Sequence, residues 1–284
     1  MDHARPSHTA LRVALRRAAH QLYDAPPLVF PDPMATAILG PHAEELQRTP
    51  GRDEQLKPRP FSIALRAFLV ARSRYAEDLL AQAVQRGVTQ YVLLGAGLDT
   101  FAHRNPYPSL RVFEVDHPAT QQWKRELLLS SGVSTPARLT YAPVDFEHQS
   151  PEEQLRSAGF NPAARTFFAW LGVVPYLTRD AFRATIRFIA SQPPGSGVVF
   201  DYAQPREALG PREQLAFDSL ASRVHLAGEA FHLFFTPPKV AAELAAFYDL
   251  EDLGSPEINE RYFAGRSDKL QVLGSAGRLI SAWV

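Results

Sequence analysis

The segment Tyr91-Val-Leu-Leu-Gly-Ala-Gly-Leu-Asp-Thr100 decides the fold of this chain. It begins as a short apolar run, Tyr91 to Leu94, and then breaks at Gly95 and Gly97. This pattern is typical of a buried parallel strand that ends in a tight turn at a nucleotide site. Glycine suits such a turn because it lets the backbone approach a ligand that a Cβ atom would push away.

A second strand-like run, Arg111-Val-Phe-Glu-Val-Asp116, follows the turn and ends in a carboxylate. Nucleotide-binding sheets place the acid that binds the ribose hydroxyls about 20 residues beyond the glycine turn. Apolar runs separated by helical segments predict an α/β fold with a doubly wound, mostly parallel, seven-stranded sheet. We predict its strands at 90–95, 111–116, 139–145, 166–173, 197–202, 247–253 and 278–284.

The first 88 residues have a helical pattern, and residues 89–284 contain all the predicted strands. We therefore predict an N-terminal helical extension, over 1–88, and a core over 89–284, joined in one integrated domain. Leu11, Leu15, Ala18 and Leu22 recur on one face of the first helix.

The rest of the extension follows from local signals. Asp32 can cap a short helix that starts at Pro33. Residues 41–60 have the composition of an exposed loop. A long helix is then expected over 61–87, with Arg72 in the middle of its apolar stripe.

The composition excludes several classes of function. Thirty basic and thirty acidic residues give a formal net charge of zero, and no basic stripe predicts binding to nucleic acid. The absence of cysteine rules out disulfides, thiolate nucleophiles and zinc–thiolate sites. The histidines lack the spacing of a metal site, the first residues lack the apolar core of a signal peptide, and no apolar stretch could span a bilayer. We predict a soluble, cytoplasmic protein without a metal and without nucleic-acid or membrane partners.

The chemistry of the glycine turn discriminates among cofactors. Such a turn can hold NAD, FAD or S-adenosylmethionine, but the dinucleotide fingerprint G-x-G-x-x-G requires a third glycine. Here Thr100 takes that place, and Asp99 would lie beside a pyrophosphate. S-adenosylmethionine has no phosphate, and its sulfonium and ammonium groups are cationic, so a carboxylate in the turn is compatible with it. The turn therefore favours S-adenosylmethionine over NAD.

Four motifs in order carry a family resemblance: Leu94–Thr100, Phe113-Glu-Val-Asp-His-Pro118, Val144-Asp-Phe146 and Trp170-Leu-Gly-Val-Val-Pro-Tyr-Leu177. Together they resemble the leucine carboxyl methyltransferase family, and most of all its bacterial branch that includes polyketide carboxyl O-methyltransferases. The resemblance runs from about residue 8 to the end of the chain. It implies a class I methyltransferase sheet and S-adenosylmethionine as the cofactor.

The resemblance also implies roles for single residues. Asp116 matches the acid that holds the ribose hydroxyls, and a carboxylate is suited to accept from a vicinal diol. Asp145 matches the acid that takes the adenine amino group, with Phe146 packing beside it. Arg72 matches the arginine that binds the methionine carboxylate, whereas Leu171 departs from the glutamate that the family often has. The cofactor-binding set that we predict is Arg72, Gly95, Ala96, Gly97, Asp99, Asp116, His117, Asp145, Phe146, Trp170 and Leu171.

Four members of this set have structural interpretations that remain open, and one of them is Trp170, which could be part of the core or of a pocket wall. Arg72 could lay its stem on apolar surface with its charge in water. Asp116 could cap the helix that starts at Pro118, and Asp145 could be a turn residue. If Arg72 binds the cofactor, we expect its guanidinium to be partly buried and uncompensated in the absence of that cofactor.

The reaction implied is methyl transfer to oxygen. A carboxylate acceptor needs no strong general base, whereas a phenol or alcohol does. No fixed motif supplies a base, and the catalytic candidates are Tyr202, His225 and His232. We expect the N-terminal helices and region 203–240 to form the acceptor pocket, where an aromatic cluster predicts an apolar acceptor or is part of the core.

Three functions remain open. The first is an O-methyltransferase of a small-molecule carboxylate or acidic hydroxyl. The second is methylation of a protein C-terminal carboxylate, and the third is a cofactor-binding module without activity.

Overall fold

The computed structural model describes residues 6–48, 60–145, 149–226 and 230–284. Within these residues, seven strands form one sheet in the order β3-β2-β1-β4-β5-β7-β6. The five strands β3, β2, β1, β4 and β5 are parallel to one another, whereas β7 is antiparallel to both β5 and β6. The strands are β1 Gln90–Leu94, β2 Arg111–Asp116, β3 Leu139–Pro143, β4 Thr166–Trp170, β5 Gly197–Ala203, β6 Tyr248–Leu253 and β7 Gly277–Trp283.

The sequence prediction of a mostly parallel, seven-stranded α/β sheet is confirmed. Two strands end at least two residues earlier than predicted, β3 at Pro143 and β4 at Trp170. Val144 after β3 and Leu171 after β4 continue the apolar runs, and both line a cavity. The Val144 amide still donates to the Asp116 carbonyl at 2.9 Å. A helix that was not predicted, α9 (Ser255–Tyr262), lies between β6 and β7.

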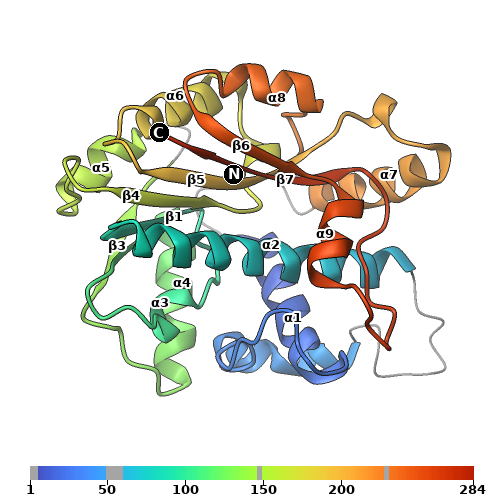
Figure 1. The fold of residues 1–284 in the computed structure, drawn as a ribbon. Coiled ribbons are helices and arrows are strands. Elements are labelled where there is room, and N and C mark those ends of the chain that lie inside the picture. Colours follow the sequence, from blue (N-terminus) through green and yellow to red (C-terminus); the bar gives the residue numbers. More distant parts are fainter. Residues whose placement is uncertain (1–5, 49–59, 146–148, 227–229) are drawn as a thin grey trace.

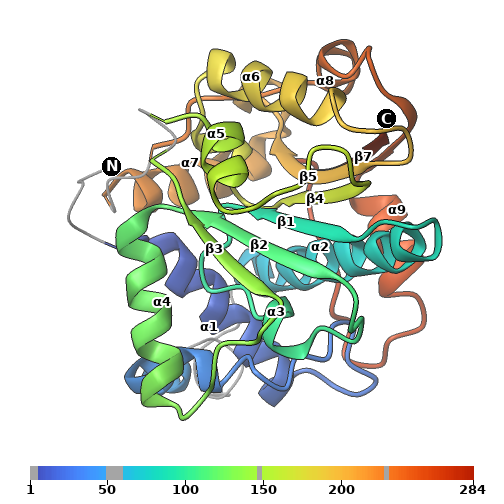
Figure 2. The ribbon, with the colours of Figure 1, turned by 90° about the vertical axis from the view of Figure 1, so that its left-hand side faces the viewer.

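Helices cover both faces of the sheet (Figures 1 and 2). On one face lie α2 (Pro60–Gln85), α3 (Phe101–Arg104), α4 (Pro118–Ser130) and α9. On the other lie α5 (Pro151–Ser157), α6 (Arg179–Ala190) and α8 (Pro237–Glu243). Beyond the carboxyl end of β5, η3 (Arg206–Ala208) leads into α7 (Pro211–Leu226).

Side chains alternate between two hydrophobic cores, because successive residues of a strand point to opposite faces. On β1, Tyr91 and Leu93 pack on the α2 side, whereas Val92 and Leu94 pack on the α6 side. The same alternation on β5 sends Val199 to the α2 side and Phe200 to the α6 side. This two-sided burial explains why the strands are continuous apolar runs.

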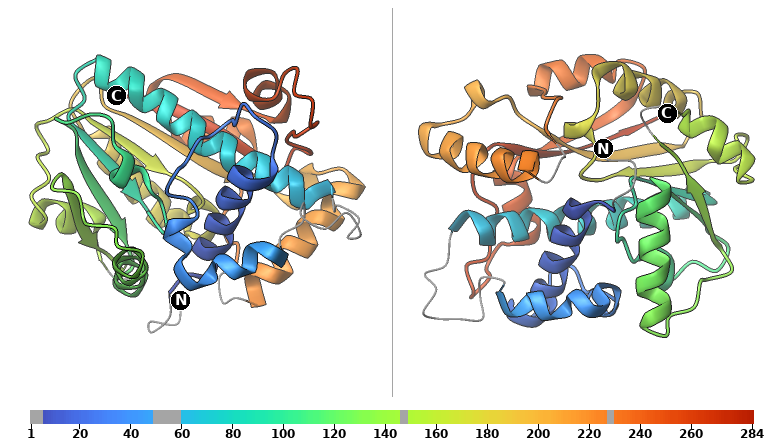
Figure 3. Two further views of the ribbon diagram at one scale, coloured as in Figure 1. Left: turned by 90° about the horizontal axis from the view of Figure 1, so that it is seen from below. Right: turned by 180° about the vertical axis from the view of Figure 1, so that it is seen from behind.

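The N-terminal helices form a third apolar cluster. Seen from below, α1 (His8–Tyr23) packs against α2, whereas η1 (Ala37–Arg48) packs against α1 and α4 (Figure 3, left). The exposed loop predicted over 41–60 is wrong for residues 41–48, which belong to η1 and include the buried Leu46, and residues 49–59 lie outside the described part of the chain. The predicted helix from Pro33 begins as a turn whose Met34 amide donates to Asp32 Oδ1 at 3.0 Å. None of the described helices is long and apolar enough to cross a bilayer.

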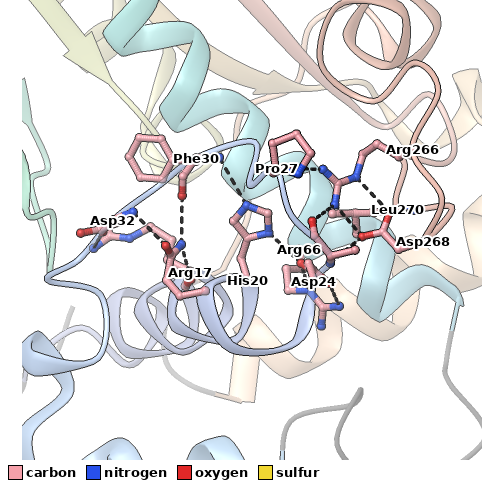
Figure 4. Close-up of polar contacts among 12 residues, drawn as sticks. Arg17, His20, Asp24, Pro27, Phe30, Asp32, Arg66, Arg266, Asp268 and Leu270 are labelled. Atoms are coloured by element: carbon pink, nitrogen blue, oxygen red, sulfur yellow. Dashed lines mark hydrogen bonds and ion pairs between the residues drawn. The ribbon is translucent and has the colours of Figure 1, made fainter.

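Buried ion pairs fix this segment to the core (Figure 4). Arg66 on α2 donates to both oxygens of Asp24, at 3.0 and 2.6 Å, just after α1 ends. His20 accepts from the Phe30 amide through Nε2, so its Nδ1 carries the proton and donates to Asp24 at 2.7 Å. Arg17 donates to the Leu98 carbonyl at 2.9 Å. The helical segment is therefore tied both to α2 and to the glycine turn.

We predict that Asp24→Ala destabilises the fold strongly. Both Asp24 and Arg66 are nearly inaccessible, and removing one partner of a buried pair leaves an uncompensated charge, at a loss of about 3–5 kcal/mol of unfolding free energy. Denaturant unfolding measures this loss. The control is Glu152→Ala, which breaks an exposed pair with Arg156 and should lose less than about 1 kcal/mol. Equal losses in the two variants would contradict the anchoring role.

Candidate active site

A cavity of about 690 Å³ lies at the carboxyl edge of the parallel strands. Its floor is the end of β1 together with the glycine turn that follows, from Leu93 to Asp99. Residues at or just beyond the ends of β2, β3 and β4 form its sides. Parts of α1, α2 and α6 complete the wall, as does the short helix η2 (Val174–Tyr176). Ligands of open α/β sheets bind at this edge because all the parallel strands end there.

The glycines of the turn are required by the packing of the protein itself. Gly95 has φ +70°, and a Cβ atom there would lie 2.3 Å from Val173 Cγ2. Gly97 has φ +50°, and its Cβ would lie 3.1 Å from the Cβ of Ala10 on α1. A side chain at either position would push apart the walls of the cavity. Both glycines line the cavity, with Ala96 between them.

Asp116 lies at the tip of β2 and joins two turns. Its Oδ2 accepts from the Gly97 amide at 2.5 Å, and its Oδ1 accepts from the His117 amide at 2.7 Å. Burial raises the pKa of this carboxyl. The interpretation of Asp116 as a helix cap is wrong, since it is His117 that caps α4, with Nδ1 accepting from the Ala119 amide at 3.2 Å. Asp116 and His117 both line the cavity.

Asp99 closes the glycine turn as an ionised group. Its burial raises the pKa, but the charges of Arg17, Lys124 and Arg104 outweigh this, and the net pKa lies below the ordinary value. Oδ1 also accepts from the Phe101 amide at 2.7 Å, and Arg17 lies 3.7 Å from Oδ2. The turn therefore brings a carboxylate to the cavity, with the guanidinium of Arg17, which also lines the cavity, beside it.

Arg72 lines the cavity but is not uncompensated. Its Nη1 donates to Asp201 Oδ2 at 3.0 Å, and both side chains are less than a tenth exposed. The expectation of an unpaired guanidinium is thus wrong. Asp201 was missed because its partner lies 129 residues away in the chain. A signal was nevertheless present, since Asp201 is the single charged residue of β5, in an otherwise apolar run.

The pleat of β4 separates two predicted cofactor residues. Leu171 faces the α2 side and lines the cavity. Trp170 does not line it: the indole is fully buried on the opposite face and stacks on Phe182 at a centroid distance of 5.6 Å. Trp170 is therefore a core residue. Asp145 lies at the cavity beyond β3, whereas Phe146 lies outside the described residues.

The three catalytic candidates are not brought together. Tyr202 packs on the α6 side, donates to Asp252 at 2.7 Å and has its pKa raised by burial, so it does not face the cavity. His225 lies on α7 and does not line the cavity. His232 does line it, and its amide donates to the Pro175 carbonyl at 2.7 Å. In the described part of the chain, no group of three or more His, Asp and Glu could hold a metal ion.

The segment after α7 serves both the core and the mouth of the cavity. Leu233 and Phe235 are buried in the core. Phe231 is half-buried and lies against Tyr176, a cavity residue, with ring centroids 5.2 Å apart. The other rings of this half-buried aromatic cluster are Phe217 and Phe234.

Comparison with known sequences settles the family. A family model described as leucine carboxyl methyltransferase matches residues 10–190, more than half of the chain. The chain belongs to the leucine carboxyl methyltransferase family. A putative S-adenosyl-L-methionine-dependent methyltransferase, YktD of Bacillus subtilis (strain 168), is 34% identical over 289 residues, which cover 93% of each chain. The predicted resemblance is confirmed, and it places this member of the leucine carboxyl methyltransferase family among the S-adenosylmethionine-dependent methyltransferases.

Solved structures agree with the fold. A DUF574 family protein from Streptomyces avermitilis superposes with a TM-score of 0.59 at 17% identity, over 99% of this chain and 98% of the other. A putative methyltransferase from Thermobifida fusca gives a TM-score of 0.59 at 15% identity, over 99% and 96%. At these identities the likeness concerns the fold alone.

We predict that Arg72→Met lowers the stability of the unliganded protein. The change leaves the buried Asp201 carboxylate without its cation, which should cost about 3–5 kcal/mol of unfolding free energy. Arg74→Met is the matched control from the same helix. Its exposed pair with Asp78 is worth about 0–1 kcal/mol. Chemical denaturation without ligand gives both values, and an Arg72→Met protein as stable as the parent would contradict the pairing.

Proposed function

We propose that this methyltransferase binds S-adenosylmethionine across the carboxyl edge of β2, β1 and β4, and methylates a carboxylate or acidic hydroxyl of a small, largely apolar molecule. The observation that carries the proposal is the order of groups along the cavity. Asp116 stands at the β2 end, the glycine turn in the middle and Arg72 near the β4 end. Asp116, which can bind the ribose, and Arg72, which can bind the carboxylate of the cofactor, thus lie on either side of the closely packed glycine turn.

The donor set fits this cofactor. Asp116 is held with both oxygens at the cavity wall and can accept from a vicinal diol. Asp145, next along the edge, can accept from an amino group of the base. The Arg72 guanidinium can donate to the α-carboxylate. The ionised Asp99 opposes a pyrophosphate and is compatible with a cationic sulfonium, which supports S-adenosylmethionine over a dinucleotide.

The chain's own residues orient the reactants and exclude water. When bound, the cofactor supplies a methyl group already activated by a positive sulfur, so alignment and desolvation are the main demands on the protein. Val13 and Ala14 of α1 give the cavity an apolar wall, and Tyr176 lies with the aromatic cluster at its mouth. These surfaces support an apolar acceptor.

The acidity of the acceptor decides whether a base is needed. A carboxylate is already ionised at neutral pH, whereas a phenol must lose its proton. His232 is the candidate for that proton, because it is the one of the three predicted bases that lines the cavity. A small-molecule acceptor is favoured over a protein C-terminus by an enclosure built from α1, η2 and the glycine turn.

Ligand-induced stabilisation tests the cofactor. S-adenosylhomocysteine at one hundred times its Kd should raise the unfolding free energy by about 2.7 kcal/mol, and NADH should have no effect. A thermal shift with each ligand measures this. Methyl transfer from labelled S-adenosylmethionine to a panel of apolar carboxylic acids and phenols then tests the acceptor. Stabilisation by NADH alone would overturn the cofactor, and binding without any methyl transfer would favour a non-catalytic module.

We predict that Asp116→Asn weakens binding of S-adenosylhomocysteine and of adenosine alike. Both ligands carry the ribose, and hydrogen bonds to a charged acceptor are worth about 1.5–3 kcal/mol each. Affinity should therefore fall at least about ten-fold for both, measured by calorimetry. Asp180→Asn is the control, because Asp180 also lines the cavity but lies in the first turn of α6, away from Asp116 in the sequence. An unchanged affinity in Asp116→Asn, with normal unfolding, would remove Asp116 from the cofactor site.

A further inference from the structure

Asp201 joins three elements behind the cavity. It lies on β5, on the face that Val199 turns toward α2, and is 6% exposed. Its Oδ2 accepts from Arg72 on α2 at 3.0 Å. Its Oδ1 accepts from the amide of Gly172, just beyond β4, at 2.5 Å. One carboxylate therefore sets the relative positions of α2, the end of β4 and β5.

The turn at Gly172 is shaped around the guanidinium. Gly172 has φ +73°, and a Cβ atom there would lie 2.8 and 2.9 Å from the two terminal nitrogens of Arg72. The guanidinium thus lies directly over the Gly172 backbone, in a space that no side chain could share. Arg72 and Gly172 line the cavity, whereas Asp201 does not.

The hydrogen bonds show that Arg72 and Asp201 have different roles. Both oxygens of Asp201 are engaged by protein donors. A guanidinium has five N–H donors in a rigid fork, so Arg72 can bind Asp201 and still donate to a ligand in the cavity. Contact with a ligand carboxylate therefore belongs to Arg72, and Asp201 holds the fork in its direction.

The charge of the pair matters as well as its geometry. A lone buried arginine would attract any carboxylate, while an arginine paired with an acid forms a neutral unit. The amino-acid end of the cofactor is also neutral overall, because it is a zwitterion with one carboxylate and one ammonium group. The negative charge of Asp201, behind Arg72, favours the ammonium at short range because buried charges are weakly screened.

We propose that Asp201 is a positioning residue that orients Arg72 and the Gly172 turn toward the amino-acid end of the cofactor, and whose charge makes this end of the cavity select a zwitterion over a simple carboxylate. The inference rests on the proposed function. It adds a residue and a selectivity that the family resemblance did not supply.

The test compares three ligands by calorimetry. S-adenosylhomocysteine has the zwitterion, its desamino analogue keeps only the carboxylate, and 5′-methylthioadenosine has neither group. Asp201→Asn should bind S-adenosylhomocysteine roughly ten-fold or more weakly and 5′-methylthioadenosine almost as the parent does. Its preference for S-adenosylhomocysteine over the desamino analogue should also narrow.

Two further variants separate position, charge and stability. Asp201→Glu keeps the charge but displaces it by one methylene, so it should weaken S-adenosylhomocysteine binding while keeping the preference over the desamino analogue; it also carries the test if Asp201→Asn does not fold. Asp252→Asn is the matched control. It alters an Arg–Asp pair between β6 and β7, with Arg278, and the hydrogen bond from Tyr202; none of these three residues lines the cavity, so all three affinities should stay unchanged.

The outcomes are distinguishable. If Asp201→Asn and Asp201→Glu lose affinity for S-adenosylhomocysteine and 5′-methylthioadenosine equally, Asp201 is merely structural and the inference is overturned. Unchanged S-adenosylhomocysteine affinity in both variants overturns it too, while the proposed function stands. A parent protein that binds none of the three ligands overturns the proposed function and the inference together.

Discussion

The parallel direction of β3, β2, β1, β4 and β5 is the constraint on which the site depends. Parallel strands end at one edge of a sheet, so the loops that follow them must meet there whatever their sequences. Asp116, the glycine turn and Gly172 are far apart in the chain and adjacent only for this reason. Helices on both faces then close the space from the sides, and α1 supplies the wall that the sheet cannot.

Local sequence patterns were sufficient for the strands and for the floor of the cavity. The run that ends at Leu94, and the one that ends at Asp116, are mainly apolar, with Gln90 and Glu114 as their buried polar exceptions. The first is followed directly by the glycine turn and the second by the N-terminus of α4. These strands could be predicted from neighbouring residues alone, without knowing which distant residues they contact. The 3₁₀ helix η1 escaped prediction because Gly40 and Pro41 interrupt it, and such short tight turns have weak periodicity.

Features that depend on the pleat or on distant partners escaped the sequence analysis. Trp170 and Leu171 are neighbours, and only the alternation of faces sends one into the core and the other to the cavity. The same alternation turns Tyr202 away and brings Asp201 to Arg72. The register of a strand buried on both faces cannot be inferred from its apolar residues, because every position is apolar.

The place of β7 has a consequence for the order of assembly. β7 lies between β5 and β6, although it follows both in the chain. During synthesis β6 therefore emerges with no strand to pair with, and the edge of β5 remains open until residues 277–283 can insert between them. Open strand edges promote association between chains. The interval before β7 is available is thus the stage at which nascent chains of this protein are most exposed to aggregation, and the one at which chaperones would be most useful.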